Sequence, residues 1–466
     1  MYSYANTHGS RPVGIFISKV SRARVNIYIP TFIKEPSMSF ISRLGKFGTT
    51  TLGLAGALAL SSNAFAENWP QWRGPTLDGI CKESKLPTSW SADKNIAWSL
   101  PMPGMGGSTP VIWKDKIFLT SVDGENQVVL CINTAGKKLW EKKLGEGNAK
   151  VRTDEGNGAS ASCSTDGKYV WAFVGSGTLA CMDLDGKEIW SKDLQKEYGK
   201  FKIQFGIHST PVLHENSLYM MLIHDGGGFV ISFDKNTGKE NWKIERPSDG
   251  TDENKHSYAS PVLWNNGKDA ALIIHGNDYA TGHSLKDGKE LWRVAGLNPK
   301  GDKYNKYLRF VASPVAVADL IVVPSAKNGP VVAIKPEARG LIQAGNSHEV
   351  WRKPSNTPDV PSPLVHDGLV YLSRENGFLI CIDAKTGQEY YNERVYSSRY
   401  RGSPVYADGK IYITARDGTI SVIKAGKKYE LLATNKLPVQ LSASLAIADG
   451  KIFVRGFETL YCIQEK

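Results

Sequence analysis

The sequence has few cysteines, and no two of them lie close together. Six cysteines occur among 466 residues, at positions 81, 131, 163, 181, 381 and 462. Because no Cys-x-x-Cys motif or Cys/His cluster is present, a thiol-based metal or redox site is not expected. Four of the cysteines occupy one slot of a repeated pattern described below, which is typical of a buried apolar position. We expect free, buried thiols.

Long apolar runs and nucleophile motifs are also missing. The apolar run at residues 51–60 is too short to span a bilayer, and no later stretch is long enough, so no transmembrane segment is expected. No Gly-x-Ser-x-Gly motif occurs. The glycines at 175–177 and 226–228 precede no helical pattern, so they indicate strand turns and not a phosphate-binding loop.

Acidic residues are scarce in the N-terminal segment but not in the rest of the chain. This difference accounts for about half of the net charge of +11. Residues 1–66 contain seven of the 57 basic residues and one of the 46 acidic residues. The remainder therefore has 50 basic and 45 acidic side chains, a net charge of +5. Such a balance does not indicate nucleic-acid binding, and we expect no nucleic-acid partner.

The N-terminal segment has the parts of a secretory signal at residues 38–66. Arg43 and Lys46 form a positive region, residues 51–60 form the apolar region, and Ala64-Phe65-Ala66 is a cleavage site of the A-x-A type. We expect cleavage after Ala66 and a periplasmic or secreted protein. Residues 1–37 precede a complete signal, so we expect them to be a non-native or disordered extension.

The rest of the chain is a repeat with a period of roughly 40 to 53 residues, the range of propeller blades. Each unit opens with small residues, mostly followed by proline, before a short apolar run. The eight openings are Ser108-Thr109-Pro110, Ser160-Ala161-Ser162, Ser209-Thr210-Pro211, Ala259-Ser260-Pro261, Ala312-Ser313-Pro314, Pro361-Ser362-Pro363, Gly402-Ser403-Pro404 and Ala443-Ser444-Leu445.

A large aromatic residue recurs near the end of most units, usually just after a Gly-Lys turn. We interpret this ring as the residue that fills the space between neighbouring blades. In the fifth unit a longer loop, Pro336 to Ser347, replaces the tight turn. The aromatic residues in this structural slot are Trp98, Trp140, Trp190, Trp242, Trp292, Trp351 and Tyr391.

The two ends of the repeat complete each other. The last unit ends before the strand that carries the aromatic residue in the other units. Trp98 lies in such a strand, but no complete unit comes before it. Pairing them closes the ring and removes a free sheet edge. The sequence therefore predicts an all-β fold, an eight-bladed β-propeller of four-stranded antiparallel blades over residues 92–466. Residues 67–91, aromatic and rich in turn residues, are expected to form an N-terminal strap on it.

The repeated Cys/Ile-x-Asp-x-x-Thr/Asp-Gly-Lys-x-x-Trp pattern resembles the PQQ-like β-propeller repeat. This repeat is shared by quinoprotein alcohol dehydrogenase-like enzymes and by non-enzymatic, BamB-like proteins. The resemblance implies, for the enzymes, a vicinal Cys-Cys disulfide, a Glu/Asn/Asp set around calcium and a catalytic Asp. This sequence has no Cys-Cys pair, no mappable calcium set and no Cys-x-x-Cys-His, and only Asp359 is a candidate base.

The side chains beside the openings and at the ends of the second strands are expected to surround the propeller axis. They are mostly Arg, His and Tyr, which predicts a cationic axial funnel for an anionic ligand. The alternative is that they are solvated rim residues. The candidates are His208, His224, His256, Tyr258, His275, Arg309, Arg374, Arg399, Arg401, Arg416 and Arg455.

We expect an exported, monomeric binding or scaffold propeller with no catalytic residue, metal site or cofactor of its own. Its partner would be an envelope protein or an anionic small molecule or saccharide. Two alternatives remain. One is a PQQ-dependent oxidoreductase, with calcium, acting on alcohols or sugars; the other is a carbohydrate-binding accessory protein.

Overall fold

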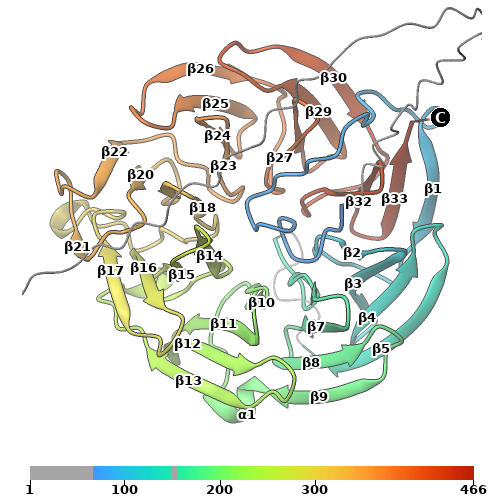
Figure 1. Cartoon of the computed structure of the whole chain (residues 1–466), viewed down its shortest axis with the longest axis horizontal. Coiled ribbons are helices and arrows are strands. Elements are labelled where there is room, and N and C mark those ends of the chain that lie inside the picture. Colours follow the sequence, from blue (N-terminus) through green and yellow to red (C-terminus); the bar gives the residue numbers. More distant parts are fainter. Residues whose placement is uncertain (1–66, 148–154, 466) are drawn as a thin grey trace, which may run out of the picture. The chain divides into compact units, whose positions relative to one another are not determined.

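The computed structural model describes residues 67–147 and 155–465, which form eight sheets arranged as a ring (Figure 1). The predicted all-β, eight-bladed propeller is thereby confirmed. The predicted signal peptide and the extension before it lie outside the described residues. Within the described residues, no helix is long and apolar enough to cross a membrane.

Seven blades follow one another along the chain, each with its strands in sequence order from the axis outward. Blades 1 and 2 comprise β2 (Val111–Trp113), β3 (Lys116–Asp123), β4 (Asn126–Asn133) and β5 (Lys138–Glu146), then β6 (Ser164–Thr165), β7 (Tyr169–Phe173), β8 (Thr178–Asp183) and β9 (Glu188–Asp193). Blades 3 and 4 comprise β10 (Val212–His214), β11 (Ser217–His224), β12 (Gly227–Asp234) and β13 (Glu240–Glu245), then β14 (Val262–Asn265), β15 (Ala270–Gly276), β16 (Tyr279–Ser284) and β17 (Glu290–Val294). Blades 5 and 6 comprise β18 (Val315–Val317), β19 (Leu320–Val323), β20 (Val331–Ile334) and β22 (Glu349–Lys353), then β23 (Leu364–His366), β24 (Leu369–Ser373), β25 (Phe378–Asp383) and β26 (Glu389–Arg394). Blade 7 comprises β27 (Val405–Ala407), β28 (Lys410–Thr414), β29 (Thr419–Lys424) and β30 (Leu431–Lys436).

Blade 8 joins the two ends of the described chain. Its inner strands are β31 (Ala446–Ala448), β32 (Lys451–Arg455) and β33 (Thr459–Gln464), and its outer strand is β1 (Ile96–Pro101). Trp98 of β1 lies opposite Cys462 of β33 in an antiparallel ladder. The predicted closure is therefore confirmed, and the ring has no unpaired strand between its first and last blades. Three short helices lie in the connections: α1 (Leu194–Tyr198), η1 (Asp252–Lys255) and η2 (Gly301–Lys303).

Outer-strand tryptophans connect five of the blades to the next one. The indole of Trp98 donates a hydrogen bond to Thr134 O, 3.0 Å away, and Trp140 donates in the same way to Leu184 O. The ring of Trp98 also lies against Gly136, which has a φ of 87° and whose added Cβ would be 2.8 Å from the ring. The glycine in this turn is thus required both by its positive φ and by the neighbouring indole. Trp190, Trp242 and Trp351 make the same inter-blade indole contact, with Lys235, Leu285 and Ala384.

Blades 4 and 5 depart from this pattern. Part of the long loop in the fifth unit forms a strand, β21 (Gly340–Ile342), which pairs in parallel with β17 and gives blade 4 a fifth strand. Because blade 5 lacks the Gly-Lys turn, Trp292 packs instead close to Gly282 of its own blade, where an added Cβ would lie 2.2 Å from its ring. The sequence predicted this region as a loop, since three residues carry too little pattern to indicate a strand.

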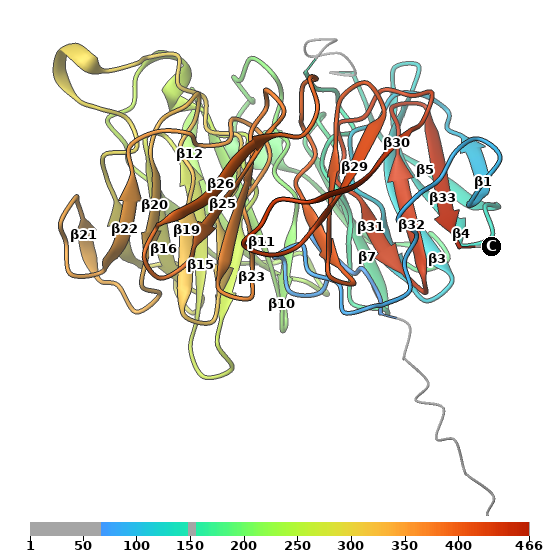
Figure 2. The same cartoon turned by 90° about the horizontal axis from the view of Figure 1, so that it is seen from above.

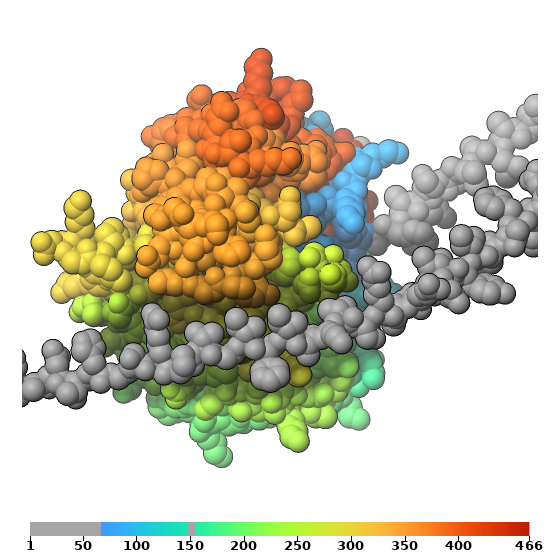
Figure 3. Space-filling view, turned by 60° about the vertical axis from the view of Figure 1, so that its left-hand side comes forward, coloured from blue at the N-terminus to red at the C-terminus, as the bar shows by residue number. Residues whose placement is uncertain are grey.

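Apolar side chains fill the spaces between adjacent blades. One cluster joins Val111 and Phe118 of blade 1 to Val170 and Met182 of blade 2, and all four are fully buried. The space-filling view shows the outer surface of the later blades as a continuous, closely packed wall (Figure 3). All six cysteines are buried and unpaired, and Cys131 and Cys163 belong to the cluster just described.

The strap, residues 67–91, crosses one end of the ring (blue in Figures 1 and 2). Trp69 pairs with Ile112 of blade 1, and Ile80 pairs with Tyr406 of blade 7. Gln71 exchanges two hydrogen bonds with the backbone of Leu213 in blade 3. The strap therefore connects blades that do not touch one another directly.

Candidate functional site

A pocket lies on the propeller axis, and the strap forms its floor. The starts of the inner strands supply most of its wall, and Trp72 of the strap also lines it. The space within it, counted together with its open mouth, is about 1030 Å³. The pocket residues with polar or aromatic side chains other than the serines and threonines are Trp72, Glu155, Phe205, His208, Tyr258, Arg309, Asp359 and Arg401.

A ring of hydroxyl groups surrounds the axis, and we call it the hydroxyl collar. From blade 1 to blade 8, the backbone N–H of each collar residue donates to the hydroxyl of the next; Ser313 N to Ser362 Oγ, at 2.9 Å, is one example. Seven such hydrogen bonds, of 2.9 to 3.2 Å, occur among the described residues. Each of the seven hydroxyls that accept an N–H keeps its own proton for a ligand or water. The collar comprises Thr109, Ser162, Thr210, Ser260, Ser313, Ser362, Ser403 and Ser444, all lining the pocket.

Charged groups from distant blades meet at the mouth of the pocket. Arg401, just before blade 7, donates from Nε and Nη2 to the two carboxylate oxygens of Glu155, each at 3.0 Å. Arg399 Nη2 lies 2.5 Å from Glu155 Oε1. Glu155 precedes the inner strand of blade 2, so this pair joins blades that are not neighbours. The geometry at Arg401 is the bidentate arrangement that guanidinium groups form with carboxylates.

The environment keeps Glu155 ionised. Partial burial tends to raise the pKa of Glu155, but the hydrogen bonds and charges of Arg401 and Arg399 outweigh it and hold the pKa below its ordinary value. The Arg401 side chain is 8% exposed and that of Glu155 is 21% exposed. The ion pair is therefore largely shielded from water and from screening by salt.

A second carboxyl pair lies beside Arg401. The neighbouring Asp359 carboxylate, together with partial burial, raises the pKa of Glu375 from 4.5 to about 7, against the opposing effect of Arg401. Glu375 Oε2 lies 3.5 Å from Arg401 Nη1. The mouth thus contains three carboxyl groups among its arginines, and its lining carries both signs of charge.

The raised pKa of Glu375 predicts a pH-dependent stability. A carboxyl whose folded pKa exceeds its unfolded pKa favours the folded state when protonated, so this contribution is lost as pH rises through the window between 4.5 and about 7. We expect Glu375→Gln to lose less stability than the wild type between about pH 5 and pH 8. The difference will be modest because the Glu375 side chain is 42% exposed.

Denaturant unfolding at the two pH values measures this effect. Glu141→Gln, which removes a carboxylate from the outer strand of blade 1, is the control. Equal pH dependence of the Glu375→Gln and wild-type proteins would contradict the assignment.

The opposite wall of the pocket is aromatic and carries one arginine. The guanidinium of Arg309 lies over the ring of Phe205, 4.7 Å from its centroid. Tyr258 packs edge-on against Phe205 and its hydroxyl lies 3.4 Å from His256 Nδ1. Burial lowers the pKa of His208 to about 4, so His208 is neutral at neutral pH.

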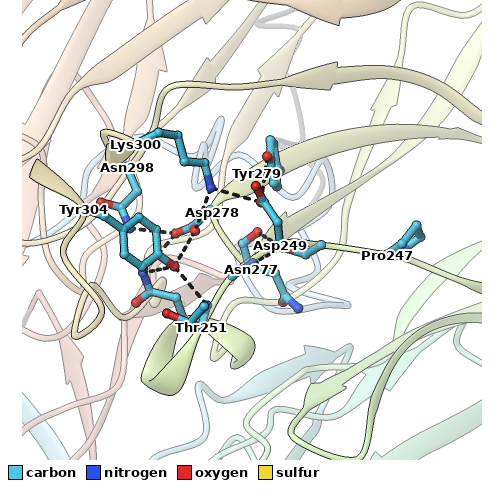
Figure 4. A network of polar contacts seen from close by, with 12 residues as sticks. Pro247, Asp249, Thr251, Asn277, Asp278, Tyr279, Asn298, Lys300 and Tyr304 are labelled. Atoms are coloured by element: carbon cyan, nitrogen blue, oxygen red, sulfur yellow. Dashed lines mark hydrogen bonds and ion pairs between the residues drawn. The ribbon is translucent and has the colours of Figure 1, made fainter. Parts of the chain in front are cut away.

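A buried carboxylate, Asp278, is the centre of a polar network (Figure 4). Asp278, in the turn between β15 and β16, is 1% exposed. Its Oδ1 accepts hydrogen bonds from Asn254 Nδ2 and Asn298 Nδ2, at 3.0 and 2.9 Å. Its Oδ2 accepts from the Tyr304 hydroxyl at 2.8 Å, and Lys300 Nζ lies 3.4 Å away. These partners lie on the two loops that lead to Tyr258 and Arg309.

The structure brings together only part of the predicted funnel. Of the candidates, His208, Tyr258, Arg309 and Arg401 line the pocket. Arg399 reaches it through Glu155, and His256 through Tyr258.

The remaining candidates are placed outside the lining. Arg374 donates to Asn328, Arg416 lies over Phe457, and Arg455 is buried with hydrogen bonds to Gly104 and Ser121. His224 accepts from the backbone of Gly226, and His275 is buried beside Phe310. Burial lowers the pKa of both histidines, so neither adds positive charge at neutral pH.

Several pocket residues were not singled out from the sequence. Glu155, Phe205 and Trp72 stand outside the strand openings that were searched, as does Glu375, which contacts Arg401 beside the lining. The collar serines were visible in every opening, but a start-of-strand serine is also a common turn residue. The collar could have been found by asking why each opening keeps a hydroxyl.

The described residues do not fit a calcium-held quinone of the kind that the repeat resemblance implies for enzymes. No group of three His, Cys, Asp or Glu side chains in the described part of the chain is arranged to hold a metal ion. The Glu155 carboxylate at the mouth is already bound by arginines. Each cysteine is a separate, buried thiol.

Comparisons with known proteins agree on the fold. A family profile described as outer membrane protein assembly factor BamB matches residues 124–389 and 338–454. No curated protein sequence matches the chain. Among solved structures, BamB from Moraxella catarrhalis is 13% identical with a TM-score of 0.53, covering 82% of this chain and 98% of that one.

Two dehydrogenase structures are also similar. A europium-containing methanol dehydrogenase is 12% identical with a TM-score of 0.66, covering 83% of this chain and 89% of its own. The quinohemoprotein alcohol dehydrogenase from Comamonas testosteroni is 14% identical with a TM-score of 0.62, covering 85% and 80%. At these identities the likeness concerns the fold alone.

Proposed function

This chain belongs to the family described as outer membrane protein assembly factor BamB, and from that premise we propose that it is a binding or scaffold propeller without catalytic activity. Its axial pocket holds a ligand that carries negative charge, and its outer surfaces are available to an envelope protein. We further propose that it acts as a monomer, in the periplasm or outside the cell, after removal of the signal peptide at Ala66.

One observation carries the proposal: most of the polar groups in the pocket are already paired. Seven of the eight collar hydroxyls accept a backbone N–H, and Glu155 is held by two arginines. A nucleophile would need an adjacent base, and among the described residues no collar hydroxyl is hydrogen-bonded to a carboxylate or an imidazole. Asp359 Oδ1 and His208 Nε2 are the unpaired acceptors in the lining. This arrangement favours recognition over chemistry.

The alternative function is that of a quinoprotein dehydrogenase. It is favoured by Asp359, the candidate base, which lines the pocket and whose Oδ1 has no hydrogen-bond partner among the described residues. Against it stands the lining, in which no calcium-binding group occurs among the described residues.

Reconstitution with PQQ and calcium distinguishes the two functions. The mature protein is incubated with both, desalted, and examined for quinone absorbance and for dye reduction with alcohols or sugars. We expect neither, because the described pocket has no group to hold the metal. A known quinoprotein treated in parallel serves as the positive control. Stoichiometric quinone retention with dye reduction would contradict the scaffold function.

A further inference from the structure

The bidentate pair between Glu155 and Arg401 shows how the pocket recognises a carboxylate. Glu155 lies on blade 2 and Arg401 on blade 7, so the pair is not part of the packing between adjacent blades. Both residues line the pocket. In this structure a carboxylate of the chain itself therefore occupies the bidentate anion-binding face of Arg401.

An incoming carboxylate could exchange with Glu155 at little electrostatic expense. After the exchange Arg401 is still paired with one carboxylate, so the buried guanidinium does not become unpaired. The Glu155 side chain is 21% exposed, whereas Arg401 is 8% exposed. Glu155 is thus the partner with access to solvent, and Arg401 is the fixed one.

Deeper in the pocket the groups suit a ring that carries hydroxyls. The collar hydroxyls each retain a proton to donate. At the floor, Trp72 lines the pocket and is half-buried, so its indole can stack on a ring. The C–H face of a pyranose is apolar and flat enough for such stacking, and its hydroxyls can accept from the collar.

From these three features we propose that the axial pocket binds an acidic sugar of the hexuronate class. Its carboxylate takes the place of Glu155 at Arg401, its ring stacks on Trp72, and its hydroxyls bind the collar. Glu155 acts as a built-in competitor that lowers the apparent affinity. This assignment rests on the proposed binding function of the pocket and specifies the ligand.

Titration calorimetry with three probes tests the assignment. D-glucuronate has the ring and the carboxylate, glucose has the ring alone, and succinate has carboxylates without the ring. The mature wild-type protein is expected to bind glucuronate more tightly than either of the others. If Glu155 occupies the site about 90% of the time, Glu155→Gln will tighten glucuronate binding about tenfold and leave glucose binding unchanged.

Two further variants test separately how the pocket binds the carboxylate and the ring of the ligand. Arg401→Lys keeps the charge but loses the bidentate geometry, so glucuronate affinity should fall. Trp72→Ala should weaken glucuronate binding about fivefold and leave succinate unaffected. Glu141→Gln, which removes a carboxylate from an outer strand, is the matched control for Glu155→Gln and should change nothing. Circular dichroism establishes that each variant is folded.

Several results would overturn the assignment. Absence of glucuronate binding to both wild type and Glu155→Gln would do so, as would an equal gain for glucose in Glu155→Gln. If succinate bound as tightly as glucuronate to every variant, the sugar ring would not contribute to binding, and the assignment to a hexuronate would be wrong. Because PQQ retention is measured separately, a protein that binds neither glucuronate nor PQQ contradicts this assignment alone, whereas PQQ retention contradicts the scaffold function.

Discussion

Replacing Trp69 with alanine is expected to lower the free energy of unfolding by about 3 kcal/mol, near the lower end for a buried tryptophan. Trp69 is fully buried in the cluster that joins the strap to blades 1, 7 and 8. Its backbone exchanges hydrogen bonds of 2.9 and 2.8 Å with Ile112. The indole N–H has no partner among the described residues, and removing it offsets part of the loss.

Denaturant unfolding followed by circular dichroism measures the loss. Trp72→Ala is the matched control, because Trp72 belongs to the same strap but is only half-buried and faces the pocket. Its stability should change by at most about 1 kcal/mol. If both variants lost the same stability, the strap would not be anchored through Trp69.

Asp278→Ala is expected to lower the free energy of unfolding by about 3 kcal/mol, since it leaves buried donors without their acceptor. Asn254 and Asn298 would each lose a hydrogen bond to the carboxylate, as would the Tyr304 hydroxyl. The loops that carry these residues should then exchange amide hydrogens faster than the blades do. Hydrogen exchange with mass spectrometry, together with denaturant unfolding, measures both effects.

Asp249→Ala provides the control for Asp278→Ala. Asp249 contacts the same Lys300, at 3.0 Å, but its side chain is 63% exposed. Exposed ion pairs contribute little, so its stability should change by less than about 1 kcal/mol. Faster exchange throughout the ring in Asp278→Ala, and not only in the two loops, would show that Asp278 supports the whole propeller instead of those loops alone.

The blade architecture was predictable because it is repeated. A serine before an inner strand is weak evidence once and strong evidence in all eight openings, and four tryptophans after Gly-Lys turns strengthen it. Closure was predictable for the same reason, since Trp98 had no unit of its own and the last unit had no tryptophan. The fifth strand of blade 4 was not predictable, because β21 occurs once and has only three residues.

The candidate site was predictable only in part, because its residues do not repeat. Arg401 and Arg309 were found from their positions beside strand openings, and both line the pocket. Glu155 was not found, although it is the residue that pairs with Arg401. The positive charge expected from His208 does not arise, because burial lowers its pKa to about 4.

By itself the sequence determined the fold class, the number of blades and the way the ring closes, since these depend on local patterns that recur along the chain. The tertiary structure alone decided which side chains meet over the axis. Residues 246 positions apart, Glu155 and Arg401, form one ion pair there, and the strap places Trp72 on the pocket floor. Such contacts depend on where the ring brings its openings together, and burial then sets which of their charges persist.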